Sequence, residues 1–79
     1  MDEVQIRLMG CFAAVFPALT QEQVLRADHY NVSRWDSVAS VTLFATIEEE
    51  FGVEVDLQDF SGLVSFETIL GYLSSKTTA

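Results

Sequence analysis

The segment from residue 37 to residue 51 constrains the fold most, because its apolar residues recur at the spacing of one helix face. They follow one another at intervals of three, three and four residues, which the repeat of an α-helix brings to the same side. Asp36 or Ser37 can cap the start of this helix, and Gly52 can take the left-handed conformation that ends it. The apolar stripe comprises Val41, Phe44, Ile47 and Phe51. We therefore predict a helix over 37–51 that must bury this stripe against other elements.

Two further apolar stripes predict a helix near each end of the chain. Pro17 ends the first, and Ser65 can cap the last. The stripes comprise Val4, Leu8, Phe12 and Val15 in the first helix and Phe66, Ile69, Leu70 and Leu73 in the last. Residues 18–35 have weaker periodicity and predict a long loop, in which Thr20 and Gln23 can cap one short turn. After the helix over 37–51, Asp56 can cap a second short turn. Four residues are expected to pin the long loop to the core: Leu25, Tyr30, Val32 and Trp35.

These elements predict an all-α fold, a small four-helix bundle with three main helices, one short helix and a long first loop. No linker or repeat divides the sequence, so we expect a single domain over residues 1–79 and a monomer. A chain of this size buries only about 60% of the surface of its unfolded form. Short helices are individually marginal, so packing between them must supply the stability.

Charge and cysteine content narrow the functional class. Twelve acidic and four basic residues give a formal charge of −8, which repels nucleic acid and anionic membranes and attracts basic protein surfaces. We therefore expect no nucleic-acid partner. The apolar run 8–19 is shorter than the ~18 residues that a membrane span requires, so we expect a core helix there and no membrane insertion. Cys11 is the only cysteine and cannot form an internal disulfide, which favours a buried thiol in a cytoplasmic protein.

The inventory of reactive side chains argues against an enzyme. His29 is the only histidine and Cys11 the only cysteine, so a zinc site of the usual kind cannot be assembled. The composition leaves a Ser37, His29 and Asp36 triad open, but the side chains of adjacent residues point in different directions, and a triad depends on geometry. No glycine-rich phosphate loop is present. We predict neither a catalytic site nor a metal site.

An aspartate and a serine at a helix start are common as a plain cap, so their meaning depends on the surrounding pattern. Residues 36–38, Asp-Ser-Val, resemble the Asp-Ser-Leu signature of the acyl carrier protein family. Residues 48–55 resemble the acidic segment of that family, at the family's distance from the serine. Residues 63–66 and 69–73 resemble its last loop and helix. The resemblance covers residues 36–73 well and the first helix by pattern alone.

The resemblance implies a carrier that is not itself an enzyme. A phosphopantetheinyl transferase with Mg²⁺ would attach 4′-phosphopantetheine from coenzyme A to Ser37, and the thiol of this arm would hold acyl groups as thioesters. Acyl-loading, synthase and acyltransferase enzymes with basic docking patches are the implied partners. The family positions that such partners recognise fall on Asp36, Val38, Val41, Glu48 and Glu49.

The acidic run 48–50 also has a physical argument in favour of recognition. Three acids in the last turn of a helix oppose its dipole, which costs stability. When no structural contact offsets this cost, a role in binding is favoured.

The resemblance further implies that an acyl chain is sheltered among Ile47, Val55, Leu63 and Ile69. Three large rings are expected to crowd that space: Phe44, Phe60 and Phe66.

Departures from the fatty-acid type leave the pathway open. Ala39 and Thr42 replace family acids, so the front of the recognition helix carries less charge. A specialised polyketide, lipid or polysaccharide pathway is as compatible with the sequence as fatty-acid synthesis. Two alternatives remain: a peptidyl or aminoacyl carrier of the same fold, and an unmodified helical protein-interaction module in which Ser37 is only an N-cap.

Overall fold

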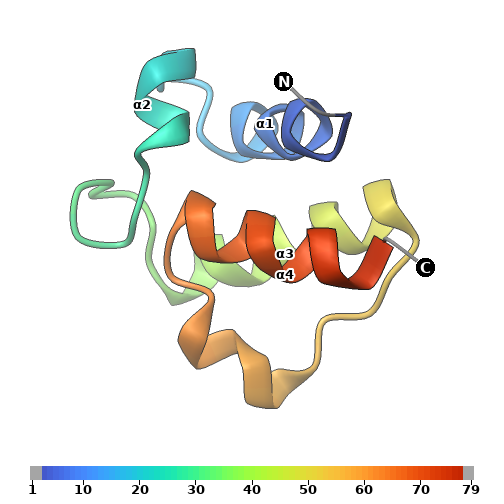
Figure 1. Cartoon of the computed structure of the whole chain (residues 1–79). Helices are drawn as coiled ribbons and strands as arrows, with labels where there is room; N and C mark the ends of the chain where they lie inside the picture. Colours follow the sequence, from blue (N-terminus) through green and yellow to red (C-terminus); the bar gives the residue numbers. More distant parts are fainter. Residues whose placement is uncertain (1–2, 78–79) are drawn as a thin grey trace.

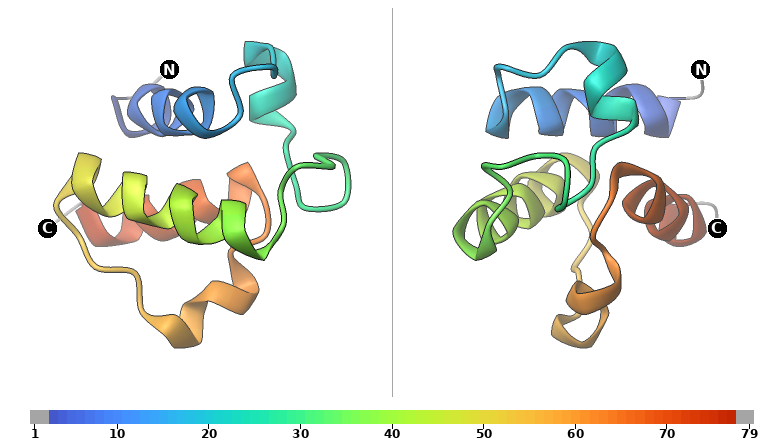
Figure 2. Two further views of the ribbon diagram at one scale, coloured as in Figure 1. Left: turned by 180° about the vertical axis from the view of Figure 1, so that it is seen from behind. Right: turned by 90° about the vertical axis from the view of Figure 1, so that its left-hand side faces the viewer.

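The computed structural model describes residues 3–77, and this part of the chain is helical without any strand (Figure 1). Its elements are α1 (Glu3–Val15), α2 (Gln21–Leu25), α3 (Ser37–Phe51), the 3₁₀ helix η1 (Leu57–Gly62) and α4 (Phe66–Thr77). Helix α1 lies across one side of α3 and α4, and η1 lies on their opposite side (Figure 2). The predicted all-α fold with three main helices is therefore confirmed.

The predicted turn in the first loop is a complete short helix, α2, because both halves of a capping box are present. The Thr20 hydroxyl accepts a hydrogen bond from the Gln23 backbone N–H (3.2 Å), and the Gln23 side chain accepts one from the Thr20 N–H (2.9 Å). The predicted end of α3 is also confirmed. Gly52 has a φ of 66°, a conformation that costs glycine little, and its N–H donates to the Glu48 carbonyl.

The predicted cap of the last helix is confirmed, whereas the predicted cap of η1 is wrong. At the start of α4, the Ser65 hydroxyl accepts a hydrogen bond from the Thr68 N–H at 3.1 Å. At the start of η1, the Asp56 side chain forms no capping bond. Its backbone carbonyl instead accepts from the Asp59 N–H at 2.9 Å, so η1 begins on a main-chain bond alone.

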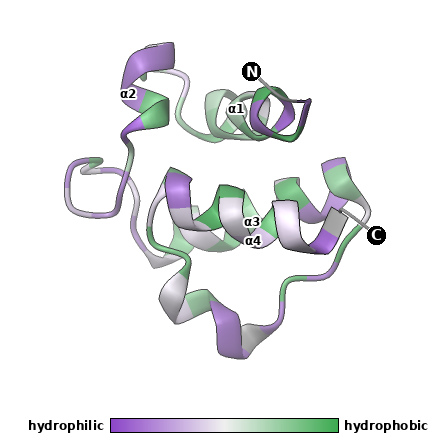
Figure 3. Cartoon of the chain, in the orientation of Figure 1, coloured by the Kyte–Doolittle hydropathy of each residue, from purple (hydrophilic) through white to green (hydrophobic). Residues whose placement is uncertain are grey.

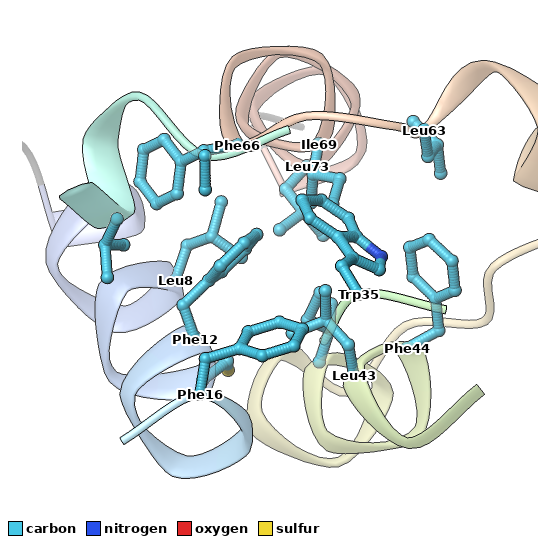
Figure 4. Packing of buried hydrophobic residues seen from close by; sticks show 14 of the residues in the cluster. Leu8, Phe12, Phe16, Trp35, Leu43, Phe44, Leu63, Phe66, Ile69 and Leu73 are labelled. Atoms are coloured by element: carbon cyan, nitrogen blue, oxygen red, sulfur yellow. The ribbon is translucent and has the colours of Figure 1, made fainter. Parts of the chain in front are cut away.

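The core is an apolar cluster formed by α1, α3, α4 and residues of the loops between them (Figure 4). Phe12 is central: its ring centroid is 5.2 Å from that of Phe66, 5.5 Å from Trp35 and 6.1 Å from Phe16. Aromatic rings at such distances add to the free energy of burial. The largest fully buried side chains are Phe12, Phe66, Leu8, Leu43, Ile47, Ile69 and Leu73.

Val41 is the member of the predicted α3 stripe that the core excludes. Its side chain is 62% exposed, whereas Leu43, which the stripe omitted, is fully buried. The buried face of α3 is centred on Leu43, Phe44 and Ile47, and Val41 lies outside it on the helix circumference.

Hydrophilic residues are concentrated on α2, on the loop after it and on η1 (Figure 3). The three long helices carry most of the apolar residues. Every helix within residues 3–77 is too short or too polar to cross a membrane.

The turn at residues 28–31, between α2 and α3, is held by side-chain hydrogen bonds rather than by Tyr30. Asp28 Oδ1 accepts from the N–H groups of Tyr30 and Asn31, at 2.8 Å each, and Asn31 Oδ1 accepts from the Asp28 N–H at 3.0 Å. This turn places Tyr30 at the tip, where it is 87% exposed, so the prediction that Tyr30 pins the loop is wrong. The other three residues predicted to pin it are buried or half-buried: Leu25, Val32 and Trp35.

Arg7 ties α1 to the end of α3. Its Nε lies 2.9 Å from Glu50 Oε2, its Nη2 donates to the Glu50 carbonyl, and its guanidinium lies 4.6 Å from the Phe51 ring centroid. A cation at a helix C-terminus also offsets the dipole. The other ion pair within residues 3–77 is exposed and joins Arg26 to Glu22 at 3.4 Å. Of the acids within residues 3–77, Glu50 and Glu22 form these two ion pairs, and the others form none.

This excess of carboxylates should make stability depend on salt. We expect the melting temperature to rise by about 4–8 °C between low salt and about 0.15 M ionic strength, which corresponds to the relief of about 1 kcal/mol of repulsion. Thermal melts followed by circular dichroism measure this shift. The double variant Glu49→Gln/Glu54→Gln, at two exposed positions, should melt higher at low salt and shift less. A melting temperature that does not move, or falls, would show that the acids lie too far apart to repel.

Candidate functional site

Ser37 is the first residue of α3, and its hydroxyl is exposed and free. The N-cap is Asp36, whose Oδ1 accepts a hydrogen bond from the Ala39 N–H at 2.8 Å. Because Asp36 caps the helix, the Ser37 hydroxyl is not needed for this purpose and has no hydrogen-bond partner within residues 3–77. The alternative in which Ser37 serves as a plain N-cap is therefore wrong.

Trp35 fixes the residues that lead into Ser37. Its indole is buried against the Phe12 ring, and its Nε1–H donates to Ser40 Oγ at 2.9 Å. A buried indole N–H requires an acceptor, but the sequence did not show that Ser40 provides it. The bond joins the segment before α3 to the first turn of α3, so the position of Ser37 follows from the packing of the core.

A hollow of about 650 Å³ opens directly beside Ser37. It is lined by the first half of α3 and the two residues before it, by residue 29 of the long loop, and by residues 60, 61, 63 and 64. Trp35, Phe44 and Leu63 come from three separate segments and lie at the same end of the core (Figure 4). Two of the rings that line the hollow, Phe44 and Phe60, pack against each other, with centroids 4.5 Å apart. An apolar hollow of this size can receive part of a flexible chain tethered at Ser37.

The four residues expected to shelter an acyl chain lie at different depths. Leu63 lines the hollow beside Ser37, whereas the other three do not line it. Those three are buried in the core: Ile47, Val55 and Ile69. Of the rings expected to crowd the space, Phe44 and Phe60 border the hollow, and Phe66 instead packs on Phe12.

The residues expected to contact partners occupy two regions of α3. Asp36, Val38 and Val41 are exposed around Ser37 at its start. Glu49 is exposed near its end, but the neighbouring Glu48 is half-buried, and its Oε2 accepts from the Val55 N–H at 2.8 Å. Glu48 therefore holds the segment after α3, as far as Val55, close to the end of that helix.

The prediction that the acids 48–50 make no stabilising contact within the fold is wrong for two of the three. Glu48 satisfies the Val55 N–H, and Glu50 pairs with Arg7. Glu49 has neither kind of contact within residues 3–77 and is the acid of this run that stands free for a partner.

The Glu48 contact gives a prediction about stability. Glu48→Ala should lower the free energy of unfolding by about 1–2 kcal/mol, because it leaves a part-buried N–H without its acceptor. Glu48→Gln keeps an acceptor oxygen and should cost less, and Glu49→Ala should change stability by no more than about 0.5 kcal/mol. Urea denaturation followed by circular dichroism would rank the three variants. Equal losses for Glu48→Ala and Glu49→Ala would show that the hydrogen bond contributes nothing.

The residues of the possible triad share a region but not a hydrogen-bond chain. His29, Asp36 and Ser37 all border the hollow, yet the Asp36 carboxylate is engaged with the helix start. The His29 ring packs edge-on against Tyr30, with centroids 4.1 Å apart. No hydrogen bond joins the three side chains in the described part of the chain, and no group of three potential metal ligands is found there. The described side chains therefore do not form the hydrogen-bonded triad that a serine nucleophile requires.

Comparison with known protein families agrees with this geometry. The phosphopantetheine attachment site family (PP-binding) matches residues 7–73, which include Ser37 and most of the chain. A comparison with curated proteins finds no match. The family match implies a 4′-phosphopantetheine prosthetic group and modification by a phosphopantetheinyl transferase, and domains of this kind are typically non-catalytic carriers. The exposed Ser37 and the adjacent hollow fit such a group. The chain therefore belongs to the phosphopantetheine attachment site family of carrier proteins.

Proposed function

We propose that the chain is an acyl carrier that holds acyl groups as thioesters on 4′-phosphopantetheine at Ser37. It presents them to enzymes of fatty-acid synthesis or of a specialised polyketide, lipid or polysaccharide pathway. The observation that carries this proposal is the exposed Ser37 hydroxyl, left free at the start of α3 because Asp36 supplies the cap. The resemblance of residues 48–55 and 63–73 to acyl carriers favours acyl cargo over peptidyl or aminoacyl cargo.

Attachment of the arm is a substitution at phosphorus. Ser37 Oγ forms a bond to the phosphorus that bears pantetheine in coenzyme A, the bond from that phosphorus to adenosine 3′,5′-bisphosphate breaks, and the hydroxyl proton passes to the transferase. The chain itself holds the Ser37 hydroxyl in position, since Asp36 and the Trp35–Ser40 hydrogen bond hold the first turn of α3. When attached, the group supplies the thiol that forms the thioester.

We further propose that short acyl chains enter at Leu63 and extend toward Ile47, Val55 and Ile69. Support comes from the burial of all four and from the apolar core, which holds no buried polar or charged residue among those described. The Phe44–Phe60 ring pair borders the hollow beside Ser37, and we expect a chain that goes deeper into the core to displace one of these rings. Enzyme partners with Arg and Lys are proposed to read Asp36 and Glu49, which remain exposed.

A count of reactive thiols tests the attachment. Burial, assisted by the negative charge of Glu50, raises the pKa of the Cys11 thiol to about 11, so little thiolate forms there near neutral pH. The folded chain should resist iodoacetamide at about pH 8, and one reactive thiol should appear after treatment with coenzyme A, Mg²⁺ and a phosphopantetheinyl transferase. Unfolding in urea should expose the Cys11 thiol as a second reactive thiol. We infer a reducing, cytoplasmic setting from this single cysteine. A treated, folded chain without a reactive thiol would refute the attachment.

The nature of the cargo can be read from the protein isolated from the cells that make it. Mild hydroxylamine cleaves thioesters, and mass spectrometry identifies the released hydroxamates. Acyl or oxoacyl products support an acyl carrier, whereas aminoacyl or peptidyl products would establish the alternative carrier type.

A further inference from the structure

His29 is the residue at which the long first loop returns to the candidate attachment site. The loop after α2, the start of α3 and the segment before α4 lie at the same end of the bundle (Figure 1). His29 and Ser37 come from two of these segments, yet both line the hollow of about 650 Å³. The only histidine of the chain therefore borders the space into which a group attached at Ser37 can extend.

Backbone contacts hold His29 at this place. Its N–H donates to the Val64 carbonyl at 3.0 Å, and the neighbouring Asp28 forms an isolated antiparallel β-bridge with Ser65. The Asp28 side chain also closes the turn that follows, because its Oδ1 accepts from the N–H groups of residues 30 and 31. His29 is therefore preorganised at the rim of the hollow, although it lies in a loop.

The His29 ring has unused hydrogen-bonding capacity. It is exposed and makes no side-chain hydrogen bond or ion pair within residues 3–77. Its edge-on contact with Tyr30, at 4.1 Å between ring centroids, restricts the directions in which it can point. A neutral imidazole offers one donor and one acceptor. Two other polar side chains of the hollow are already engaged, since Asp36 caps α3 and Ser40 accepts from an indole N–H.

The chemistry of pantetheine matches the two kinds of residue around this hollow. Beyond its phosphate, the arm carries two methyl groups on one carbon, a hydroxyl and two amides before the thiol. Phe60 and Leu63 offer apolar surface to the methyl groups. An amide that leaves water requires a hydrogen-bond partner, and the His29 ring can provide one. Ser61 also lines the hollow, but it lies in η1, which begins on a main-chain bond alone.

We propose that His29 holds the phosphopantetheine arm of its own chain, through a hydrogen bond from the imidazole to an amide of pantetheine. This inference rests on the proposed function, because it takes Ser37 as the modified residue. The fixed backbone of His29 lowers the entropic cost of the contact. A single hydrogen bond favours the held arm only about fivefold over the free arm, so a partner enzyme can draw the arm away.

The test follows the contact by NMR in the full chain, isotope-labelled and then modified with unlabelled coenzyme A, Mg²⁺ and a phosphopantetheinyl transferase. Because His29 is the only histidine, its ring signals are assigned without ambiguity. These signals should shift when the arm is attached, and isotope-filtered spectra should show nuclear Overhauser effects between the His29 ring and the pantetheine protons. The Ser37→Ala chain, treated in the same way, should show neither change.

Variants measure the contribution of the ring. His29→Ala should lower the ratio of held to free arm about fivefold, as measured from the nuclear Overhauser effects between the arm and Leu63. His29→Gln keeps a donor and an acceptor and should restore part of this ratio. Ser61→Ala, which removes another exposed polar group from the same hollow, is the matched control and should behave as wild type. Circular dichroism checks that every variant is folded.

The possible results separate this inference from the proposed function. A wild-type chain that gains no mass would refute the attachment and this inference with it. A chain that gains the expected mass but shows no change at the His29 ring would overturn this inference alone. Equal losses for His29→Ala and Ser61→Ala would assign the contact to the hollow as a whole. A change confined to the phosphorus signal of the arm in His29→Ala would place His29 on the phosphate, and would overturn the amide contact.

Discussion

Ser37→Ala should abolish the mass increment that coenzyme A, Mg²⁺ and a phosphopantetheinyl transferase add to the wild-type chain. Alanine has no nucleophilic oxygen, and the hydroxyl it replaces has no hydrogen-bond partner in the described structure. The free energy of unfolding should therefore change by no more than about 0.5 kcal/mol. A complete loss of modification in a fully folded chain identifies a site of attachment rather than a structural residue.

Neighbouring hydroxyls provide the controls. Ser33→Ala, at an exposed loop position, should be modified like wild type. Ser40→Ala removes the acceptor of the Trp35 indole N–H, so we expect lower stability but continued modification at Ser37. Asp36→Asn keeps a capping oxygen and removes the charge, and thereby separates the capping role of Asp36 from recognition. Persistent modification of Ser37→Ala would show that another residue carries the arm.

Phe12→Ala should have the largest effect on stability. The ring is fully buried and contacts three other aromatic rings, so its loss should cost about 3–5 kcal/mol. A chain of this length has a free energy of unfolding of about 4–12 kcal/mol in total, so the variant should lose at least about a quarter of it and unfold at a clearly lower urea concentration. Urea denaturation followed by the fluorescence of Trp35, the only tryptophan, reports directly on this cluster.

Two further variants show whether the loss is specific to the core. Ile6→Ala, at a 55% exposed position of α1, should cost no more than about 0.5 kcal/mol, although it also removes a large side chain from that helix. Phe12→Leu keeps most of the apolar volume and should be intermediate. If Phe12→Ala loses less than about 1 kcal/mol, the aromatic cluster is not the centre of stability.

The start of α3 shows how much of the candidate site can be predicted from neighbouring residues in the sequence. Asp36, Ser37 and the pattern 48–55 were sufficient to propose a carrier site at the start of a helix. Which of the two residues caps that helix was undecided, because both side chains can accept the same N–H. The structure assigns the cap to Asp36, and this assignment leaves Ser37 free. The acids 48–50 likewise look equivalent in the sequence, but only packing shows that Glu48 binds the Val55 N–H and that Glu49 is free.

The sequence by itself predicted the three main helices and Ser37 as the candidate for modification, because these depend on periodicity, on Pro17 and Gly52, and on motifs read within a few residues. The tertiary structure decided what depends on the meeting of distant segments. Arg7 pairs with Glu50, 43 residues away, and the face that α3 turns to α1 excludes Val41 and buries Leu43. Tyr30 is exposed because the Asp28–Asn31 bonds, and not its own apolar surface, hold the turn. A helical pattern fixes which residues share a side, but the side that is buried is chosen by the surfaces that pack against it.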